Sequence, residues 1–182
     1  MGSSFAGREF VERIAAATIG TTTNFYRDGD GAERRRRRLA GYLDSRRSAP
    51  LLLVGEAAGY RGARVSGIPF TSERQLTGTG PAEASATIVH RVLAELGIEE
   101  RVMLWNVVPT HPGTASSNRS PTAAEIEAGG AFVRELARGR RVLAVGRVAE
   151  RALGIEGVRH PSHGGAAAFR AGLVQWIGAD RP

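Results

Sequence analysis

The stretch LLLVGEAAGYRGARVSGIPFTSERQL, residues 51–76, constrains the fold more than any other part of the chain. Its first four residues form an unbroken apolar run, which is typical of a strand buried on both faces of a parallel sheet. Gly55 and Gly59 follow, and glycine lets the backbone approach a ligand closely. Ligands of open parallel sheets bind beyond the carboxyl ends of the strands. We therefore expect three side chains of this stretch to lie in a binding site: Glu56, Tyr60 and Phe70.

Two further runs, mostly apolar, predict short buried strands, Val102–Val108 and Val142–Val145, and Val158–His160 is predicted as a fourth, short strand. The segments between the runs carry apolar residues at helical spacing, so strands and helices alternate along the chain. This alternation predicts an α/β fold, a three-layer α/β/α sandwich with a central, mainly parallel four-stranded sheet. Glu56, Asn106 and His160 each lie at or near the end of a different predicted strand, so we expect them to converge on one rim of the sheet.

Apolar spacing predicts helices in six segments: 10–17, 32–43, 81–96, 122–138, 148–153 and 169–177. Pro81 is expected in the first turn of the third helix, and Thr122 with Glu125 has the spacing of a capping box. Five consecutive arginines, Arg34–Arg38, lie on the second predicted helix and point all around it. Two interpretations remain open: a solvated helix face, or phosphate contacts from two or three of these arginines.

The length of 182 residues suits a single domain, 1–182, in which residues 1–48 form a helical, arginine-rich N-terminal extension. No apolar stretch is long enough to span a membrane and the start lacks a signal-like segment, so we expect a cytoplasmic protein. Cysteine is absent, which excludes disulfides, thiolate-bound zinc and cysteine-held iron–sulfur clusters. The formal charge of +7 comes entirely from arginine. It indicates a polyanionic partner, although the base composition of a GC-rich genome explains the same arginine content.

Several short motifs follow one another at the predicted strand ends and on the loops after them: Gly55–Gly59 (GEAAG), Gly67–Phe70 (GIPF), Asn106–Pro109 (NVVP), Asn118–Pro121 (NRSP) and His160–Ser162 (HPS). Together they resemble the uracil-DNA glycosylase superfamily, and in particular the branch whose first motif reads GEAPG. The resemblance covers about residues 51–169. Ala58 stands where that branch has proline, which predicts a less rigid turn, and the cysteines that hold that branch's iron–sulfur cluster are missing.

The resemblance implies a role for each part of the site. Phe70 is expected to stack on the extruded base, Asn106 to read its edge, and His160 to stabilise negative charge on the leaving uracil. Glu56 is expected to orient the attacking water or to favour a cationic sugar, and a purely structural role stays open. The sequence constrains His111 less, and a place on a surface loop is its simplest interpretation. The implied residues are, as catalytic, Glu56, His160 and Asn106; as substrate-binding, Gly55, Ala57, Gly59, Tyr60, Phe70, Asn106 and Ser162; as DNA-binding, Arg61, Arg64, Arg119 and His163.

The function that the resemblance implies is a monofunctional uracil-DNA glycosylase, a hydrolase of base excision DNA repair. Such an enzyme flips uracil out of DNA, hydrolyses its N-glycosidic bond and leaves an abasic site, with no metal or organic cofactor. We expect a monomer that binds uracil-containing DNA and no membrane. The alternatives are a non-catalytic or covalently trapping uracil-DNA-binding protein, a glycosylase that prefers another deaminated base such as hypoxanthine, and a module that binds free nucleotides.

Overall fold

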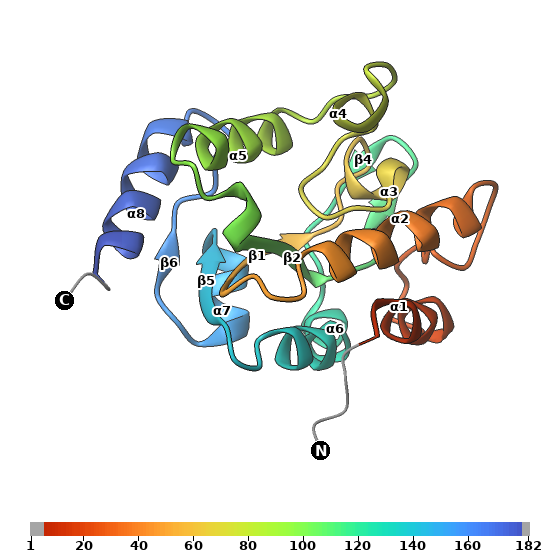
Figure 1. Cartoon of the computed structure of the whole chain (residues 1–182). Helices are drawn as coiled ribbons and strands as arrows, with labels where there is room; N and C mark the ends of the chain where they lie inside the picture. Colours follow the sequence, from red (N-terminus) through yellow and green to blue (C-terminus); the bar gives the residue numbers. More distant parts are fainter. Residues whose placement is uncertain (1–5, 180–182) are drawn as a thin grey trace.

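The computed structural model describes residues 6–179, so the predicted extension 1–48 is described from residue 6 onward. Its centre is a sheet of four strands in the order β2-β1-β5-β6, and all neighbouring strands are parallel (Figure 1). The strands are β1 Leu51–Ala57, β2 Val102–Val108, β5 Arg141–Val145 and β6 Gly157–Val158. The predicted α/β fold with a central parallel four-stranded sheet is confirmed.

Helices cover both faces of the sheet, because every second side chain of a strand points to the same face. Leu52 and Val54 of β1 pack into one core, and Leu51 and Leu53 pack into the other. The helices of the first layer are α1 Gly7–Ala16, α2 Ala32–Ser45, α6 Ala123–Leu136 and α7 Arg147–Leu153. Those of the second layer are α5 Ala84–Glu95 and α8 Ala166–Gly178 (Figure 1). No helix within residues 6–179 is long and apolar enough to cross a membrane.

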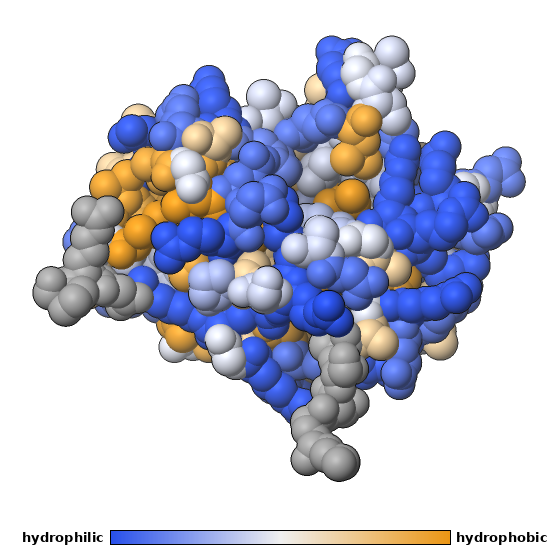
Figure 2. Space-filling view, in the orientation of Figure 1, coloured by the Kyte–Doolittle hydropathy of each residue, from blue (hydrophilic) through white to orange (hydrophobic). Residues whose placement is uncertain are grey.

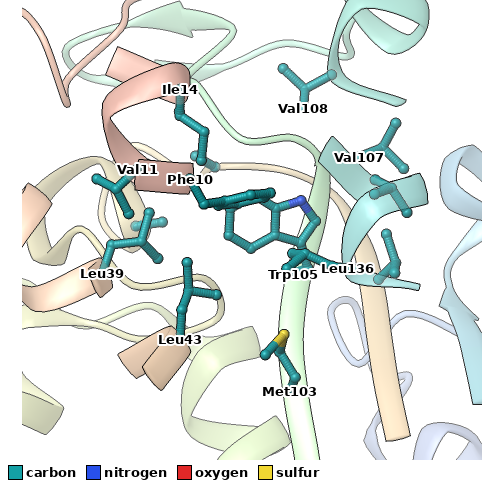
Figure 3. Packing of buried hydrophobic residues seen from close by; sticks show 14 of the residues in the cluster. Phe10, Val11, Ile14, Leu39, Leu43, Met103, Trp105, Val107, Val108 and Leu136 are labelled. Carbon is teal, nitrogen blue, oxygen red and sulfur yellow. The ribbon is translucent and has the colours of Figure 1, made fainter. Parts of the chain in front are cut away.

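The N-terminal helices form part of the first core. Figure 3 shows Phe10 of α1 against the indole of Trp105 in β2, with ring centroids 5.6 Å apart in an edge-to-face arrangement. Leu39 and Leu43 of α2 are fully buried in the same cluster. Aromatic and aliphatic groups of this size stabilise a core strongly when they are buried. The segment predicted as an extension therefore contributes two of the four helices of one layer of the sandwich.

The structure differs from the predicted elements in three places. The helix α5 begins at Ala84 and not at Pro81, because the backbone N–H of Glu83 donates to the hydroxyl of Ser72 and ends the preceding loop. Strand β6 ends at Val158, two residues before His160. Five short elements were not predicted, because so few residues show no periodicity: α3 Ala63–Ser66, α4 Glu73–Thr77, the 3-10 helix η1 Glu99–Arg101, and the hairpin strands β3 Gly113–Thr114 and β4 Ser117–Asn118.

The arginines of α2 have a structural role that neither interpretation of the sequence included. The guanidinium of Arg35 donates to the carbonyl oxygen of Phe25 (2.6 Å), and that of Arg36 donates to the carbonyl oxygen of Tyr26 (2.7 Å). Arg38 forms a bidentate ion pair with the carboxylate of Glu73. The surface over α2 is hydrophilic (Figure 2), but these three guanidinium groups bind neighbouring segments and are not simply solvated.

Candidate active site

A cavity of about 470 Å³ lies at the carboxyl ends of β1 and β2. Loops that follow β1, precede α5 and follow β6 complete its wall, as expected for a parallel sheet. The lining includes nine of the residues predicted from the sequence: Glu56, Ala57, Gly59, Phe70, Asn106, Arg119, His160, Ser162 and His163.

Gly55 brings two of these side chains together. It pairs in register with Asn106 on the neighbouring strand β2. A Cβ atom added to Gly55 would lie 2.8 Å from Cε2 of Phe70 and 3.0 Å from Oδ1 of Asn106, which is closer than real Cβ atoms come to a ring carbon. The aromatic ring and the amide therefore converge over the bare backbone of Gly55. Gly55 is not part of the cavity lining itself, and its contact with substrate stays a prediction.

Phe70 is held in an unusual backbone conformation. Within residues 6–179, Phe70 (φ +52°) and His163 (φ +51°) are the two residues other than glycine with positive φ. L-amino acids with large side chains adopt this region rarely, and such residues cluster at functional sites, where the surrounding structure holds them. Both residues line the same cavity.

The segment before Phe70 supplies that support. The hydroxyl of Ser66, fully buried, donates to the carbonyl oxygen of Thr71 (2.6 Å) and accepts from the N–H of Ile68 (3.0 Å). The hydroxyl of Tyr26, which precedes α2, donates to the carbonyl oxygen of Gly67 (2.9 Å). These bonds fix the loop on both sides of the aromatic ring.

The side chain of Asn106 lies at the cavity without a protein partner. The residue is 4% exposed and lines the cavity, yet its side chain makes no hydrogen bond to any residue that the structure describes. Its amide reaches the open space of the cavity, because within residues 6–179 the fully buried side-chain nitrogen or oxygen without a partner is Nε1 of Trp105. The amide of Asn106 is therefore available to a ligand in the cavity.

The orientation of the His160 imidazole is set by Ser162. The backbone N–H of Ser162 donates to Nδ1 of His160 (3.2 Å), and the Ser162 hydroxyl lies 2.7 Å from the same nitrogen. Since a backbone N–H can only donate, Nδ1 accepts, and the neutral ring carries its proton on Nε2. Burial, and secondarily the charge of His163, lower the pKa of His160 below its ordinary value. At neutral pH the ring is a neutral hydrogen-bond donor.

Two carboxyl groups line the cavity without an ion-pair partner in the described chain, Glu56 and Glu83. Glu83 was not among the sequence predictions because it lies in no motif. Its backbone immediately precedes α5. Burial raises the pKa of its carboxyl group above the ordinary value. Hydrophobic spacing does not predict that Glu83 lies at the cavity, because this position depends on the contact between the loop 59–62 and the start of α5.

Besides Gly55, three predicted residues lie outside the cavity lining, Tyr60, Arg61 and Arg64. The backbone N–H of Tyr60 donates to Oδ1 of Asn118 (2.9 Å), and the substrate contact of the Tyr60 side chain stays a prediction. Arg61 is exposed and Arg64 is half-buried, and neither side chain has a hydrogen bond or ion pair within residues 6–179.

Arg119 lines the cavity, but its guanidinium is already paired. It forms a bidentate ion pair with the buried carboxylate of Glu125, at 2.6 and 2.8 Å, and also donates to the hydroxyl of Thr21. This pairing favours a structural role and leaves its phosphate contact a prediction.

His111 is buried, and its predicted place on a surface loop is wrong. Its Nδ1 lies 2.7 Å from the carbonyl oxygen of Ala58, and its Nε2 lies 2.7 Å from that of Thr114. The ring thus connects the loop after β1 to the β3–β4 hairpin. Asn118 of that hairpin also lines the cavity. The sequence indicated it only as the first residue of the NRSP motif, without a role of its own.

The α/β/α sandwich therefore has an amide, an aromatic ring and an imidazole around one cavity at its strand ends, where proteins of this fold class bind ligands. The chain belongs to the uracil DNA glycosylase superfamily, whose family model matches residues 42–175. Membership supports a DNA glycosylase, a DNA-binding hydrolase of DNA repair. No curated protein matches the chain.

Among solved structures, the crystal structure of wild-type SMUG2 from Pedobacter heparinus is similar to this one, with a TM-score of 0.65. The two sequences are 15% identical, and the match covers 95% of this chain and 96% of that chain. At this identity the similarity shows a shared fold that includes the N-terminal helices α1 and α2.

Proposed function

We propose that this protein is a monofunctional uracil-DNA glycosylase, which hydrolyses the N-glycosidic bond of uracil in DNA and leaves an abasic site. The main observation behind the proposal is the amide of Asn106, which faces the cavity and has no protein partner within residues 6–179. An amide donates and accepts at once, so it can donate to a uracil carbonyl and accept from the ring N–H. Cytosine presents an amino group where uracil has a carbonyl, and it cannot satisfy this pair of bonds.

Phe70 would supply the face on which the extruded base stacks. Flipping a base out of a duplex costs a few kcal/mol, and stacking on an aromatic ring contributes roughly 1 to 3 kcal/mol. The ring approaches the Asn106 amide over Gly55, which supports a planar base lying on the ring with its edge toward the amide.

His160 would stabilise the leaving base. In the tautomer that Ser162 selects, Nε2 donates, and a donor aimed at a uracil oxygen stabilises the negative charge that develops there. Loss of one such donor commonly costs about 100- to 1000-fold in rate. The carboxylate of Glu56 would favour the cationic sugar by its charge.

We further propose that the chain is nearest to the branch with a GEAPG first motif, and that α2 supports the Phe70 loop where that branch has an iron–sulfur cluster. The contacts of Arg38 with the carbonyl oxygen of Ser66 and with Glu73 support this replacement. So does the bond from Tyr26 to Gly67.

The test is a panel of single-stranded and duplex oligonucleotides that carry uracil, hypoxanthine, xanthine or thymine, incubated with protein and then treated with alkali to cleave abasic sites. We expect strand cleavage at uracil, with multiple turnover, and none at thymine. Preferred cleavage at hypoxanthine would assign the enzyme to another deaminated base. Uracil-DNA retained after denaturation, without turnover, would identify a covalently trapping protein, and no cleavage or retention of any strand would contradict the proposal.

A further inference from the structure

Two charged side chains of the cavity, Glu56 and Glu83, have carboxylates without a partner within residues 6–179, and Glu83 is the one whose pKa is raised by burial. The guanidinium of Arg119 pairs with Glu125, and the rings of His160 and His163 both contact the Ser162 hydroxyl. The carboxylates of Glu56 and Glu83 make no hydrogen bond or ion pair to residues 6–179. The cavity therefore holds two free carboxyl groups on different walls, one at the end of β1 and one before α5.

The loop after β1 leaves room for the Glu83 carboxyl group at two glycines. A Cβ atom added to Gly59 would lie 2.9 Å from Cδ of Glu83, and one added to Gly62 would also lie 2.9 Å from it. Carboxylate oxygens come closer still to both positions. Neither glycine has a positive φ, so the backbone conformation does not explain why glycine occupies these two positions. The absence of two side chains is what lets the carboxyl group lie against this loop.

The backbone of Glu83 is fixed on both sides. Its N–H donates to the Ser72 hydroxyl (2.9 Å), and its carbonyl oxygen accepts from the N–H of Thr87 (3.1 Å) in the first turn of α5. The carboxyl group is therefore presented from a rigid position and does not hang from a long loop. A catalytic group needs such a position, because misplacement by about 1 Å costs up to about 100-fold in rate.

The environment suits a proton acceptor. Burial without a compensating partner disfavours the charged form, and this raises the pKa of Glu83. A general base works best when its pKa lies close to the working pH, and hydrolases of glycosidic bonds use carboxyl groups in this role. With no protein donor attached, the Glu83 oxygens are free to accept from a water molecule.

We propose that Glu83 is the general base of the hydrolysis and holds the attacking water against the Gly59–Gly62 loop. This inference rests on the proposed glycosidase function. The water oxygen forms a bond to C1′ of the deoxyribose while Glu83 takes one of its protons. The bond from C1′ to the base nitrogen breaks, and its electron pair leaves with the base, which Asn106 and His160 stabilise. Glu83 then returns the proton to solvent, and the product sugar carries a hydroxyl at C1′.

The experiment compares Glu83→Gln with wild-type protein. Glutamine keeps the size of the side chain and cannot accept the proton. Its matched control is Glu127→Gln, the same change at an exposed position of α6. Cleavage of a single-stranded uracil oligonucleotide is measured in single turnover from about pH 5 to about pH 9, and DNA affinity is measured by fluorescence anisotropy. We expect at least about 100-fold slower cleavage for Glu83→Gln at pH 7, with DNA affinity and thermal midpoint close to wild type, and no change for Glu127→Gln.

The pH profile separates Glu83 from the other titratable groups of the cavity, Glu56, Arg119, His160 and His163. The wild-type rate should rise with pH as Glu83 loses its proton, and this acid limb should be absent in Glu83→Gln. A second variant, Glu83→Asp, keeps the base but withdraws it from the glycines, and it should cleave faster than Glu83→Gln. If Glu83→Gln does not fold, a Glu83→Asp variant with the wild-type rate and profile contradicts the role.

Other outcomes overturn the inference in distinguishable ways. Wild-type-like cleavage by Glu83→Gln, or weaker DNA binding with an unchanged maximal rate, would contradict the role of Glu83 alone, because the wild-type enzyme would still cleave. A wild-type protein that cleaves none of the modified strands would contradict the proposed function, and the role of Glu83 with it.

Discussion

At the scale of single residues, the site depends on a glycine and an amide that lie side by side on neighbouring strands. Gly55 has no side chain, so the ring of Phe70 can approach the amide of Asn106. The other residues of β2 are apolar and buried, so the polar amide of Asn106 is an exception within this strand. Polar residues within apolar strands are often found at functional sites, so we expect substitution of Asn106 to affect activity strongly.

The first prediction concerns Asn106→Asp. A carboxylate accepts hydrogen bonds but donates none, so it repels the uracil carbonyl that the amide would bind. We expect kcat/KM for single-stranded uracil DNA to fall by about 100-fold or more, while DNA affinity changes little. The control is Gln175→Glu, which makes the same change of charge at an exposed position of α8. Equal loss in both variants would show a general effect of charge and not of base reading.

Among the helices and strands, α2 supports the site although none of its residues lines the cavity. Arg38 donates to the carbonyl oxygen of Ser66 (3.2 Å) and to both carboxylate oxygens of Glu73, and so connects α2 to the segments on either side of the Phe70 loop. The neighbouring Arg37 is exposed and pairs with Glu33 within the same helix. The same residue type thus has two environments at adjacent positions.

The second prediction uses this pair. Arg38→Met removes hydrogen bonds from a charged donor and leaves the carboxylate of Glu73 unpaired, so we expect the free energy of unfolding to fall by about 2 kcal/mol and uracil cleavage to slow. Arg37→Met removes only an exposed i,i+4 ion pair and should change stability by less than about 0.5 kcal/mol. Urea denaturation measures both. Equal stability of the two variants would show that α2 does not hold the loop.

The third prediction concerns the start of α6, where Thr122 and Glu125 form the capping box expected from their spacing. The hydrogen-bonded ion pair with Arg119 and the backbone N–H of Thr122 hold the pKa of Glu125 at about 2, below its ordinary 4.5. A carboxyl group whose pKa is lower in the folded state stabilises the fold above its unfolded pKa. That stability is lost as the pH falls from about 4.5 toward about 2.

Glu125→Gln tests this contribution, because glutamine does not titrate. The variant should be less stable than wild type at neutral pH, and its urea midpoint should change less between pH 4.5 and pH 2. Parallel curves for the two proteins across this window would contradict the assignment.

The sequence predicts most elements and one part of the site, for identifiable reasons. The apolar runs of β1, β2 and β5 mark buried strands directly, and strand-end topology correctly predicts that Glu56, Asn106 and His160 reach one cavity. The roles of these residues remain predictions.

Other features depend on contacts between distant segments, which local patterns do not encode. The left-handed backbone of Phe70 relies on Ser66, and the place of Glu83 relies on the glycines of the loop after β1. The carbonyl contacts of Arg35 and Arg36 rely on the loop before α2, so a run of charges alone indicated solvent.

Across the whole molecule, the arginines that give the net charge of +7 differ in whether they are available to an external anion. Many arginines are paired with carboxylates or carbonyl oxygens inside the protein, so they offer little to an external anion. Arg61 and Arg64 lie on the loop and short helix that follow the cavity residue Gly59, and their guanidinium groups have no hydrogen-bond or ion-pair partner within residues 6–179. Arg101 is exposed just before β2, at the opposite end of the sheet from the cavity.

The fourth prediction follows from this distribution. Each arginine that contacts a phosphate releases condensed counterions, so affinity for single-stranded DNA should fall as salt rises, with a slope of about 0.7 per contact in a plot of log K against log salt. Arg61→Ala and Arg64→Ala should each lower the affinity and reduce the slope by about 0.7, and the double variant by about 1.4. Arg101→Ala removes the same charge far from the cavity and should leave the slope unchanged. If all three single variants shift the slope equally, binding follows net charge alone and the DNA does not pass over the cavity; a flat wild-type profile would exclude phosphate contacts altogether.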